Sequence, residues 1–383
     1  MTIATTPDPE SLLTTLLDGA DPSPLFEPAT VAGLELSNRF AMAPMTRSHS
    51  PGGVPTQDVV DYYVRRAQHL GLIVTEGTYV DHPSAGRSLR VPRFYGDDAL
   101  TGWQRVVEGV HAVGGRIVPQ LWHIGAVRSE SSELNPEAPV ITPSGIDLLG
   151  RPKGVAASRQ DIGDIAASFA RAARDAERIG FDGIEIHGAH GYLFDEFFWP
   201  GSNLRGDEYG GGMDGRVRMA AEVVGAIREA VSPGFPIVLR ISQWKGGIWD
   251  ARNAETPQEL EQWLLPLREA GVDVLHISTR RYWLPAFEGS ELTLAGWAKK
   301  VSGLPVIAVG SLGIRTAFGG DAEEQAASLS IAPLLELFER GEFDLVALGR
   351  AVLSDPEWTL KLREGRLAEI RGYRKEHEAE PLF

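Results

Sequence analysis

The chain of 383 residues contains no cysteine. Disulfide frameworks, thiolate metal sites, iron–sulfur clusters and cysteine nucleophiles are therefore excluded together. Long apolar runs are also missing, because no stretch reaches the roughly 18 apolar residues that a membrane-spanning helix requires. The first ten residues, MTIATTPDPE, have neither the basic start nor the apolar centre of a secretory signal. We therefore expect a cytoplasmic protein without a membrane partner.

Basic residues are in deficit. Lys and Arg number 37 against 52 Asp and Glu, which gives a formal net charge of −15. Nucleic acids and anionic membranes would repel such a chain, so we expect neither as a partner. The hydrophobic fraction of 43% nevertheless suffices for a large buried core. Any chemistry must come from His, Tyr, Arg, carboxylates or a bound cofactor.

Eight short, apolar, β-rich segments alternate with helical patterns along the chain. The clearest helical pattern is residues 161–180, where Ile162, Ile165, Phe169 and Ala172 recur at spacings of three and four. Alternating strands and helices indicate a parallel sheet, and eight strands favour closure into a single (β/α)8 TIM barrel. The eight segments begin at Arg39, Gly71, Arg116, Phe181, Pro236, Val272, Leu304 and Phe343.

Three further segments surround this barrel. Residues 25–38 read as two short strands around the Ala32-Gly33 turn, so we expect an N-terminal β-hairpin that plugs the barrel floor. The extended loop after the third strand, about residues 127–158, is expected to form part of a lid. The predicted domain plan is a loosely ordered tail at 1–24, the (β/α)8 barrel with its ligand site at 25–365, and a C-terminal extension at 366–383.

Polar residues interrupt the apolar alternation near the ends of three strands. Because side chains alternate between the two faces of a strand, Gln120, His187 and Arg240 fall on the interior face of their segments. Three separate strands thus direct polar groups at one barrel mouth. Glu185 shares the interior face with His187, and a purely structural pairing of Glu185 with Arg240 remains open.

Glycine turns follow the last two strands. The seventh segment runs into Gly310-Ser311 and the eighth into Gly349-Arg350. Backbone N–H groups at such turns, together with a guanidinium, bind phosphate, and this corner of the barrel is the usual phosphate site. Tight turns alone would also require glycine, but the presence of both turns at adjacent strand ends favours a phosphorylated ligand.

The segment from His187 to Gly211 carries the most chemistry. His187 and His190 could bind a metal together with Glu185. Alternatively, the two imidazoles polarise a carbonyl oxygen while Tyr192 supplies a proton. The second interpretation explains the polar strand ends and the phosphate corner, so we expect no metal. Because no side chain is a hydride source, that interpretation requires an organic redox cofactor.

Seven segments taken together resemble the old yellow enzyme family of NADH:flavin oxidoreductases, which are FMN-dependent ene-reductases. The resemblance implies a tightly but non-covalently bound FMN. It also implies that hydride passes from NAD(P)H through flavin N5 to the C=C bond of an activated alkene, an α,β-unsaturated carbonyl compound or a nitroalkene. The segments are NRFAMAPMTRS (38–48), VTEG (74–77), QLWHIG (120–125), 187–211, VLRIS (238–242), AVGSLG (308–313) and ALGRAVLSDPEW (347–358).

The resemblance also assigns roles to individual residues. His187 and His190 would bind the substrate oxygen, and Tyr192 would be the proton donor. Arg240 would face flavin N1 and O2, where the reduced ring carries negative charge. The positions that match the family's cofactor contacts are Pro44, Met45 and Thr46 along the ring, Gly77 where the ring approaches closely, Gln120 at the pyrimidine edge, Arg240, and Gly310, Ser311, Gly349 and Arg350 at the phosphate.

Two segments depart from the family pattern. RISQWKGG (240–247) and STRRYWLPAFEG (278–289) supply Trp244, Lys245 and the run Arg280–Trp283. These residues could recognise an acidic or large substrate, bind a nucleotide phosphate, or form the subunit contact of a homo-oligomer. Two other functions remain as alternatives: a non-catalytic flavin-binding protein and a metal-dependent barrel hydrolase.

Overall fold

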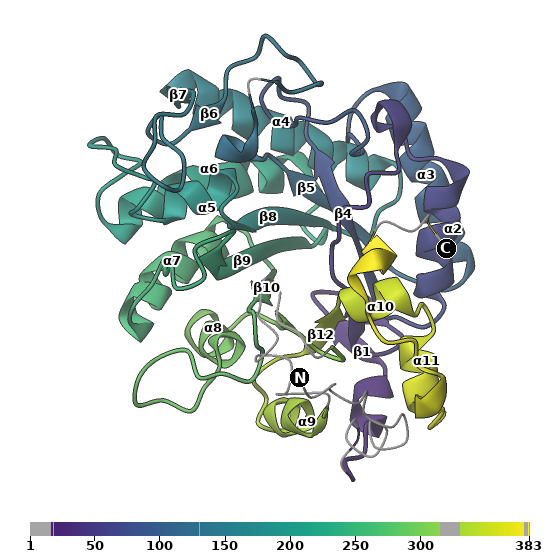
Figure 1. Ribbon diagram of the computed structural model, residues 1–383. Coiled ribbons are helices and arrows are strands. Elements are labelled where there is room, and N and C mark those ends of the chain that lie inside the picture. Colours follow the sequence, from purple (N-terminus) through teal and green to yellow (C-terminus); the bar gives the residue numbers. More distant parts are fainter. Residues whose placement is uncertain (1–16, 18, 130, 315–329, 379–381, 383) are drawn as a thin grey trace, which may run out of the picture.

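The protein is a closed barrel of eight parallel strands, described here from a computed structural model (Figure 1). The structure describes residues 17, 19–129, 131–314, 330–378 and 382. Each predicted β-rich segment contains one barrel strand, which confirms the (β/α)8 TIM barrel. Around the barrel the strands are β3 (Phe40–Met42), β4 (Leu72–Tyr79), β5 (Ile117–Trp122), β8 (Ile184–His190), β9 (Ile237–Lys245), β10 (Val274–Ser278), β11 (Val306–Val309) and β12 (Leu345–Leu348).

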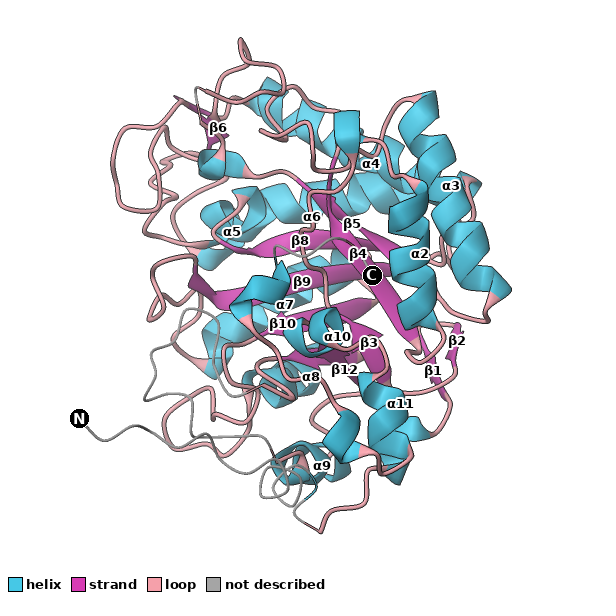
Figure 2. Cartoon of the chain, turned by 45° about the vertical axis from the view of Figure 1, so that its right-hand side comes forward, coloured by secondary structure: helices cyan, strands magenta, loops and turns pink. Residues whose placement is uncertain are grey.

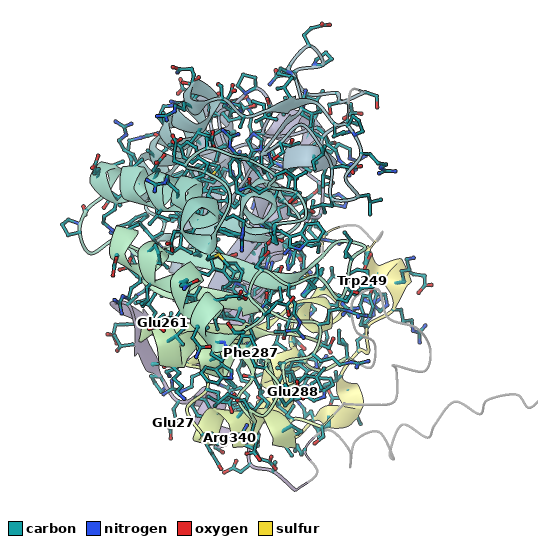
Figure 3. All side chains as sticks on the ribbon, turned by 90° about the vertical axis from the view of Figure 1, so that its left-hand side faces the viewer. Glu27, Trp249, Glu261, Phe287, Glu288 and Arg340 are labelled. Atoms are coloured by element: carbon teal, nitrogen blue, oxygen red, sulfur yellow. The ribbon has the colours of Figure 1, made fainter. Side chains whose placement is uncertain are left out.

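Helices surround the strands (Figure 2), and side chains fill the space between the two layers (Figure 3). Helix α4 (Arg159–Arg178) shows why the pattern folds in this way. The Ser158 side chain accepts from the backbone N–H of Asp161, and the predicted apolar face is buried. The other helices are α2 (Gln57–Ala67), α3 (Asp97–Ala112), α5 (Leu193–Phe198), α6 (Met213–Ala230), α7 (Pro257–Ala270), α8 (Leu294–Ser302), α9 (Ala332–Glu339), α10 (Arg350–Ser354) and α11 (Trp358–Arg363).

The N-terminal hairpin plugs one end of the barrel, as predicted. Strands β1 (Ala29–Val31) and β2 (Leu34–Leu36) pair antiparallel around Ala32 and Gly33, both of which have positive φ. Val31 and Leu36 pack against apolar interior residues of the barrel, among them Val118 and Val238. The floor is thus sealed by apolar contact, and the opposite, carboxyl-terminal end of the strands remains for a ligand.

The long loop after the third strand borders a smaller cavity beside the central one, where Ser129, Ser132 and Glu133 lie with Thr46 and Trp122 of the central lining. Its role as part of a lid remains a prediction. Within the loop, β6 (Ile141–Thr142) and β7 (Val155–Ala156) pair as a small parallel sheet. None of the described residues between 127 and 158 lines the central cavity. Instead, Leu148 packs behind the turn that follows β8, where it occupies the space that a side chain at position 191 would need.

The structure describes only part of the predicted N-terminal tail and C-terminal extension. Residues 1–16 and 18 of the tail and residues 379–381 and 383 of the extension lie outside the described residues. The described extension folds back onto the barrel: His377 is 4% exposed and its Nδ1 lies 2.7 Å from Ser354 Oγ. The short 3-10 turns are Ser23–Phe26, Pro51–Gly53, Gly125–Val127, Leu367–Glu369 and Lys375–Glu378. Among the helices described, none is long and apolar enough to cross a bilayer.

Candidate active site

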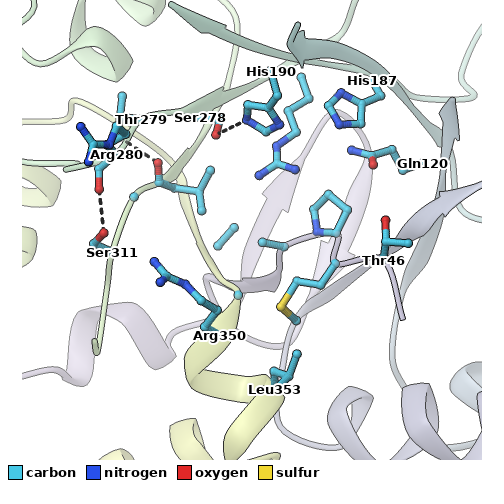
Figure 4. Close-up of a pocket in the computed structure, with 18 of the residues that line it drawn as sticks. Thr46, Gln120, His187, His190, Ser278, Thr279, Arg280, Ser311, Arg350 and Leu353 are labelled. Atoms are coloured by element: carbon cyan, nitrogen blue, oxygen red, sulfur yellow. Dashed lines mark hydrogen bonds between the residues drawn. The ribbon is translucent and has the colours of Figure 1, made fainter. Parts of the chain in front are cut away.

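A cavity of about 730 Å3 lies at the carboxyl ends of the barrel strands. This is the end at which barrel enzymes bind their ligands, and the volume suits a cofactor-sized molecule. Figure 4 shows His187, His190 and Gln120 on one side of the cavity and Arg350 across it. The predicted site residues that line it are Pro44, Met45, Thr46, Gln120, His187, His190, Tyr192, Arg240, Gly310, Ser311, Gly349 and Arg350.

Gly77 is the exception among the predicted residues. It does not line the cavity, and a Cβ atom at this position would lie 2.5 Å from Trp122 Cε3. The glycine therefore accommodates the indole of Trp122 on the neighbouring strand, and the close approach of a flavin to Gly77 remains a prediction. Trp122 itself lines the cavity, and its ring stacks on His187 with centroids 5.9 Å apart.

The two histidines and the tyrosine meet at the end of β8. His187 and His190 have ring centroids 5.2 Å apart, and Tyr192 lies 4.8 Å from His187. His190 has a positive φ of 66°, which is uncommon outside glycine, and its N–H donates to Ser242 Oγ at 3.0 Å. Its Nε2 lies 2.8 Å from the hydroxyl of Ser278 (Figure 4). A bulged strand end thus brings both imidazoles to one wall of the cavity.

Burial keeps these three groups neutral. Loss of hydration holds the pKa values of His187 and His190 well below the usual histidine range, and the nearby Arg240 charge acts in the same direction. The Ala189 N–H donates to Nδ1 of His187 at 3.4 Å, so the proton of the neutral ring resides on Nε2. Burial also raises the pKa of Tyr192, which therefore keeps its phenolic proton.

A buried carboxylate supports Gln120, next to the two histidines (Figure 4). Glu185 Oε1 accepts from Gln120 Nε2 at 2.7 Å, and Oε2 lies 2.6 Å from His276 Nδ1. Glu185 and His276 are both fully buried. Glu185 therefore forms its contacts with Gln120 and His276, and no ion pair with Arg240 exists among the described residues. In the same part of the chain, no group of three or more His, Asp or Glu side chains is placed to hold a metal ion.

Unsatisfied hydrogen-bonding groups on this side fit a flavin. Arg240 is 7% exposed, and its Nε has no hydrogen-bond partner among the described residues. A buried guanidinium requires acceptors, which the pyrimidine edge of a flavin offers. Gln120 Nε2 donates to Glu185, so the amide oxygen of Gln120 remains as an acceptor for a ligand N–H. FMN is thus a suitable occupant of this side of the cavity.

The predicted phosphate corner lies across the cavity. A Cβ atom at Gly310 would meet Thr279 Oγ1 at 2.5 Å, so that turn requires glycine. Ser311 donates its hydroxyl proton to the Arg280 carbonyl at 2.6 Å. The Arg350 guanidinium lies 5.2 Å from the centre of the Tyr373 ring. The glycine turns and the Arg350 guanidinium thus offer the backbone groups and the cation that a phosphate site needs.

Lys245 does not recognise substrate from this position, in contrast to one of the roles left open for it. Its side chain is 0% exposed, and Nζ donates to Asp195 Oδ1 and Gln243 O at 2.8 Å and to Asn253 Oδ1 at 3.0 Å. Asp195 Oδ2 accepts from the backbone N–H of Gly191, the residue between the catalytic candidates His190 and Tyr192. Lys245 therefore belongs to a buried network that holds the loop after β8.

The sequence patterns did not identify four further residues at or next to the site. Ser278 and Trp122 contact the two histidines, and Glu378 lines the cavity from the C-terminal extension. Glu76 accepts from the backbone N–H groups of Arg47 (2.8 Å) and Ser48 (3.1 Å), and burial raises its pKa to about 7. A carboxylate within the otherwise apolar segment GLIVTEG was the available signal for Glu76.

The fold and the cavity together are typical of a (β/α)8-barrel enzyme with its ligand site at the carboxyl ends of the strands. Residues 24–369 match the NADH:flavin oxidoreductase / NADH oxidase family, and the chain belongs to this family. The predicted relationship to the old yellow enzyme family is thereby confirmed. Members of this family are oxidoreductases that use FMN and nicotinamide nucleotides.

Individual relatives agree with this assignment. The chain is 35% identical over 360 residues to the NADH oxidase of Thermoanaerobacter brockii, covering 91% of this chain but only 52% of that protein. It is 32% identical over 360 residues to 12-oxophytodienoate reductase 7 of Oryza sativa subsp. japonica, covering 89% and 88% of the two chains. Morphinone reductase in complex with tetrahydroNAD superposes with a TM-score of 0.76 at 29% identity, covering 92% and 93%.

Proposed function

We propose that the protein transfers hydride from NAD(P)H to the C=C bond of an activated alkene, with Tyr192 as the proton donor. The observation that carries this proposal is the cluster of three neutral, proton-bearing side chains, His187, His190 and Tyr192, at one wall of a cofactor-sized cavity. FMN, when bound, supplies the hydride chemistry that no side chain can provide.

The two imidazoles would bind the carbonyl or nitro oxygen of the alkene. His187 offers the Nε2 proton because its Nδ1 is already an acceptor. His190 is held in place by Ser278 and by the Trp244 ring, which stacks on it at 4.3 Å. Donors fixed before the reaction stabilise the charge that develops on the oxygen without reorganising, and removal of one such donor costs about 10²–10³ in rate.

Tyr192 would hold the proton that is delivered to carbon. Its ring lies between those of His187 and Trp122, each 4.8 Å away, so its orientation is restricted. The raised pKa of Tyr192 keeps the phenol protonated at neutral pH, as an acid catalyst requires. A proton donor on the same wall as the oxygen-binding pair suits reduction of an alkene conjugated to that oxygen.

Gln120 and Arg240, beside the histidines, and the phosphate corner across the cavity would hold the cofactor (Figure 4). Arg240 provides a permanent cation for the negative charge that a reduced flavin carries, and Gln120 provides the acceptor for a ring N–H. The turns at Gly310 and Gly349 with Arg350 would hold the phosphate. The residues of the loop after β3, Pro44 to Thr46, would contact the ring.

An anaerobic titration tests this proposal. Purified protein should be yellow, NADH or NADPH should bleach it, and cyclohexenone should restore the colour. Failure of both nicotinamides to bleach the protein would contradict the proposal. Bleaching without reoxidation by enones, nitroalkenes or maleimides would favour a non-catalytic or different flavin function, and a colourless, metal-containing protein would favour a hydrolase.

A further inference from the structure

The C-terminal extension adds two residues to the phosphate corner of the central cavity. Glu378 lines the cavity together with Arg350, and Figure 4 shows the Arg350 side chain directed into it. The centre of the Tyr373 ring lies 5.2 Å from the Arg350 guanidinium, which is a cation–π contact. The Tyr373 hydroxyl donates to Glu378 Oε1. Tyr373 therefore joins the cation of the corner to the carboxylate of the extension.

The same stretch of the extension is attached to the barrel at two places. His377 is buried, and its Nδ1 lies 2.7 Å from the hydroxyl of Ser354 at the end of α10. Arg47 Nη1 donates to the carbonyl oxygen of Glu378 at 3.1 Å, and Arg47 directly follows Thr46 in the loop after β3. The extension thus bridges α10 and that loop, the two elements proposed to hold the phosphate and the ring.

The charge and the direction of Arg350 both depend on the extension. Burial lowers the pKa of Arg350, whereas Tyr373 and Glu378 act in the opposite direction and favour the charged form. A cation whose direction is restricted before the anion arrives loses less conformational freedom on binding. Glu378 also has an unfavourable effect, because its negative charge would lie near a bound phosphate and repel it.

We infer that Tyr373 is a positioning residue that holds Arg350 for the phosphate of FMN, and that the charge of Glu378 opposes phosphate binding. The inference rests on the proposed function, because the phosphate corner is assigned there. It requires that both residues act on the phosphate and not on the flavin ring. Riboflavin, which is FMN without the phosphate, separates these two effects.

The measurement is the dissociation constant of FMN and of riboflavin for the full-length protein after removal of bound flavin. The wild type should bind FMN about 10²-fold or more tightly than riboflavin, because only FMN reaches the corner. Tyr373→Leu removes the ring and the hydroxyl, so it should weaken FMN binding about tenfold and leave riboflavin binding unchanged. Tyr373→Phe keeps the ring contact and should recover most of that loss.

Glu378→Gln tests the charge of the extension separately. The new amide oxygen can still accept from the Tyr373 hydroxyl, so FMN should bind about threefold more tightly while riboflavin binding stays the same. Tyr95→Leu is the matched control. The Tyr95 ring contacts the Arg93 guanidinium at 5.5 Å, and neither residue lines the central cavity. This variant should leave both dissociation constants unchanged.

A double variant shows whether Tyr373 acts through Arg350. Arg350→Gln alone should remove most of the preference for FMN over riboflavin. Adding Tyr373→Leu should then cause no further loss, because the effects of two residues that share one interaction are not additive. Additive losses would overturn the positioning role of Tyr373.

Two results separate this inference from the proposed function. If the wild type prefers FMN but Tyr373→Leu weakens both flavins equally, the extension supports the barrel in general, and the inference is overturned while the phosphate corner stands. Unchanged FMN binding in Tyr373→Leu overturns the inference in the same way. If the wild type binds FMN no more tightly than riboflavin, the phosphate corner of the proposed function itself fails, and the inference fails with it.

Discussion

Two buried polar networks flank the active site, and they differ in how completely their hydrogen bonds are made. In the network of Lys245, Asp195 and Asn253, the three Nζ protons meet three acceptors, and both amide protons of Asn253 also have acceptors. In the network of Glu185, Gln120 and His276, the His276 Nε2 has no partner among the described residues, nor has the neighbouring Arg240 Nε.

This difference distinguishes a network that supports the active-site loop from a network that can bind a ligand. A fully satisfied buried network contributes rigidity and offers nothing to a ligand. A buried network with unsatisfied hydrogen-bonding groups carries a free-energy cost that a bound partner can relieve. The Lys245 network therefore holds the loop that carries His190 and Tyr192, whereas the Glu185 network presents Gln120 and Arg240 to the cofactor.

Removing the charge from the satisfied network should have the largest effect. Lys245→Met leaves Asp195 buried without its cation, which should lower the free energy of unfolding by about 3–5 kcal/mol in urea titrations. Lys299→Met is the control, because its pair with Asp344 is partly exposed and should contribute about 1 kcal/mol or less. Equal losses in the two variants would contradict the comparison.

Removing the proton donor should affect one half of the reaction only. Tyr192→Phe keeps the ring contacts but deletes the hydroxyl, so reoxidation of the reduced protein by an alkene should slow about 10²-fold or more. Bleaching by NAD(P)H should not change, because the cofactor side of the cavity is intact. Stopped-flow absorbance measures both halves. Tyr209→Phe, whose hydroxyl bonds Glu222 away from the cavity, should alter neither.

A third buried carboxylate, Glu76, should make stability depend on pH. Its folded pKa is about 7 and its ordinary value is 4.5, so the folded protein binds the proton more tightly than the unfolded chain. Stability is therefore highest below about pH 4.5 for this group and falls as pH rises to about 7, by up to about 3 kcal/mol.

Glu76→Gln should abolish this dependence. The buried histidines, whose lowered pKa values act in the opposite direction, titrate equally in both proteins, so the difference between wild type and variant isolates Glu76. Urea unfolding between pH 5 and pH 8 measures it. A constant difference across that range would show that Glu76 does not titrate there.

Changing the Glu185 network should have a smaller and more specific effect. In Glu185→Gln the new amide can donate to Gln120, which allows the Gln120 amide to turn its N–H toward the ligand. Wild-type apoprotein should bind 3-methyl-FMN about tenfold or more weakly than FMN, because the N3 donor is blocked. Glu185→Gln should discriminate less between the two.

Asp195→Asn is the control for the predicted change in flavin discrimination. The substitution weakens the Lys245 network without touching Gln120, so stability should fall while the discrimination against 3-methyl-FMN persists. Fluorescence titration of the apoprotein with each flavin measures the discrimination. If both variants lose it equally, the two networks are not functionally distinct.

Local patterns in the sequence account for much of the architecture. The period-2 and period-3.6 patterns located all eight barrel strands and the buried face of α4, because each depends on residues a few positions apart. The same alternation correctly placed Gln120, His187 and Arg240 at one cavity. The roles of these residues toward FMN and substrate remain predictions.

Those local patterns could not predict contacts between segments that lie far apart in the sequence. Gly77 was predicted to approach the cofactor, and its contact with Trp122 was not foreseen: the register of β4 and β5 places it opposite Gln120, where the missing side chain leaves room for that indole. Lys245 was a candidate for substrate binding, but strand β9 carries it into a buried pair with Asp195, 50 residues away.

The sequence by itself determined the barrel, its plug and the identity of the polar groups at its mouth, because side-chain periodicity and turn chemistry act over a few residues. Only the tertiary structure decided which of those groups are already satisfied. Closure of the barrel sets Arg240 beside both His187 and His276, and Glu185 beside Gln120. Hydrogen-bond satisfaction depends on such neighbours, and they come from strands far apart in the chain.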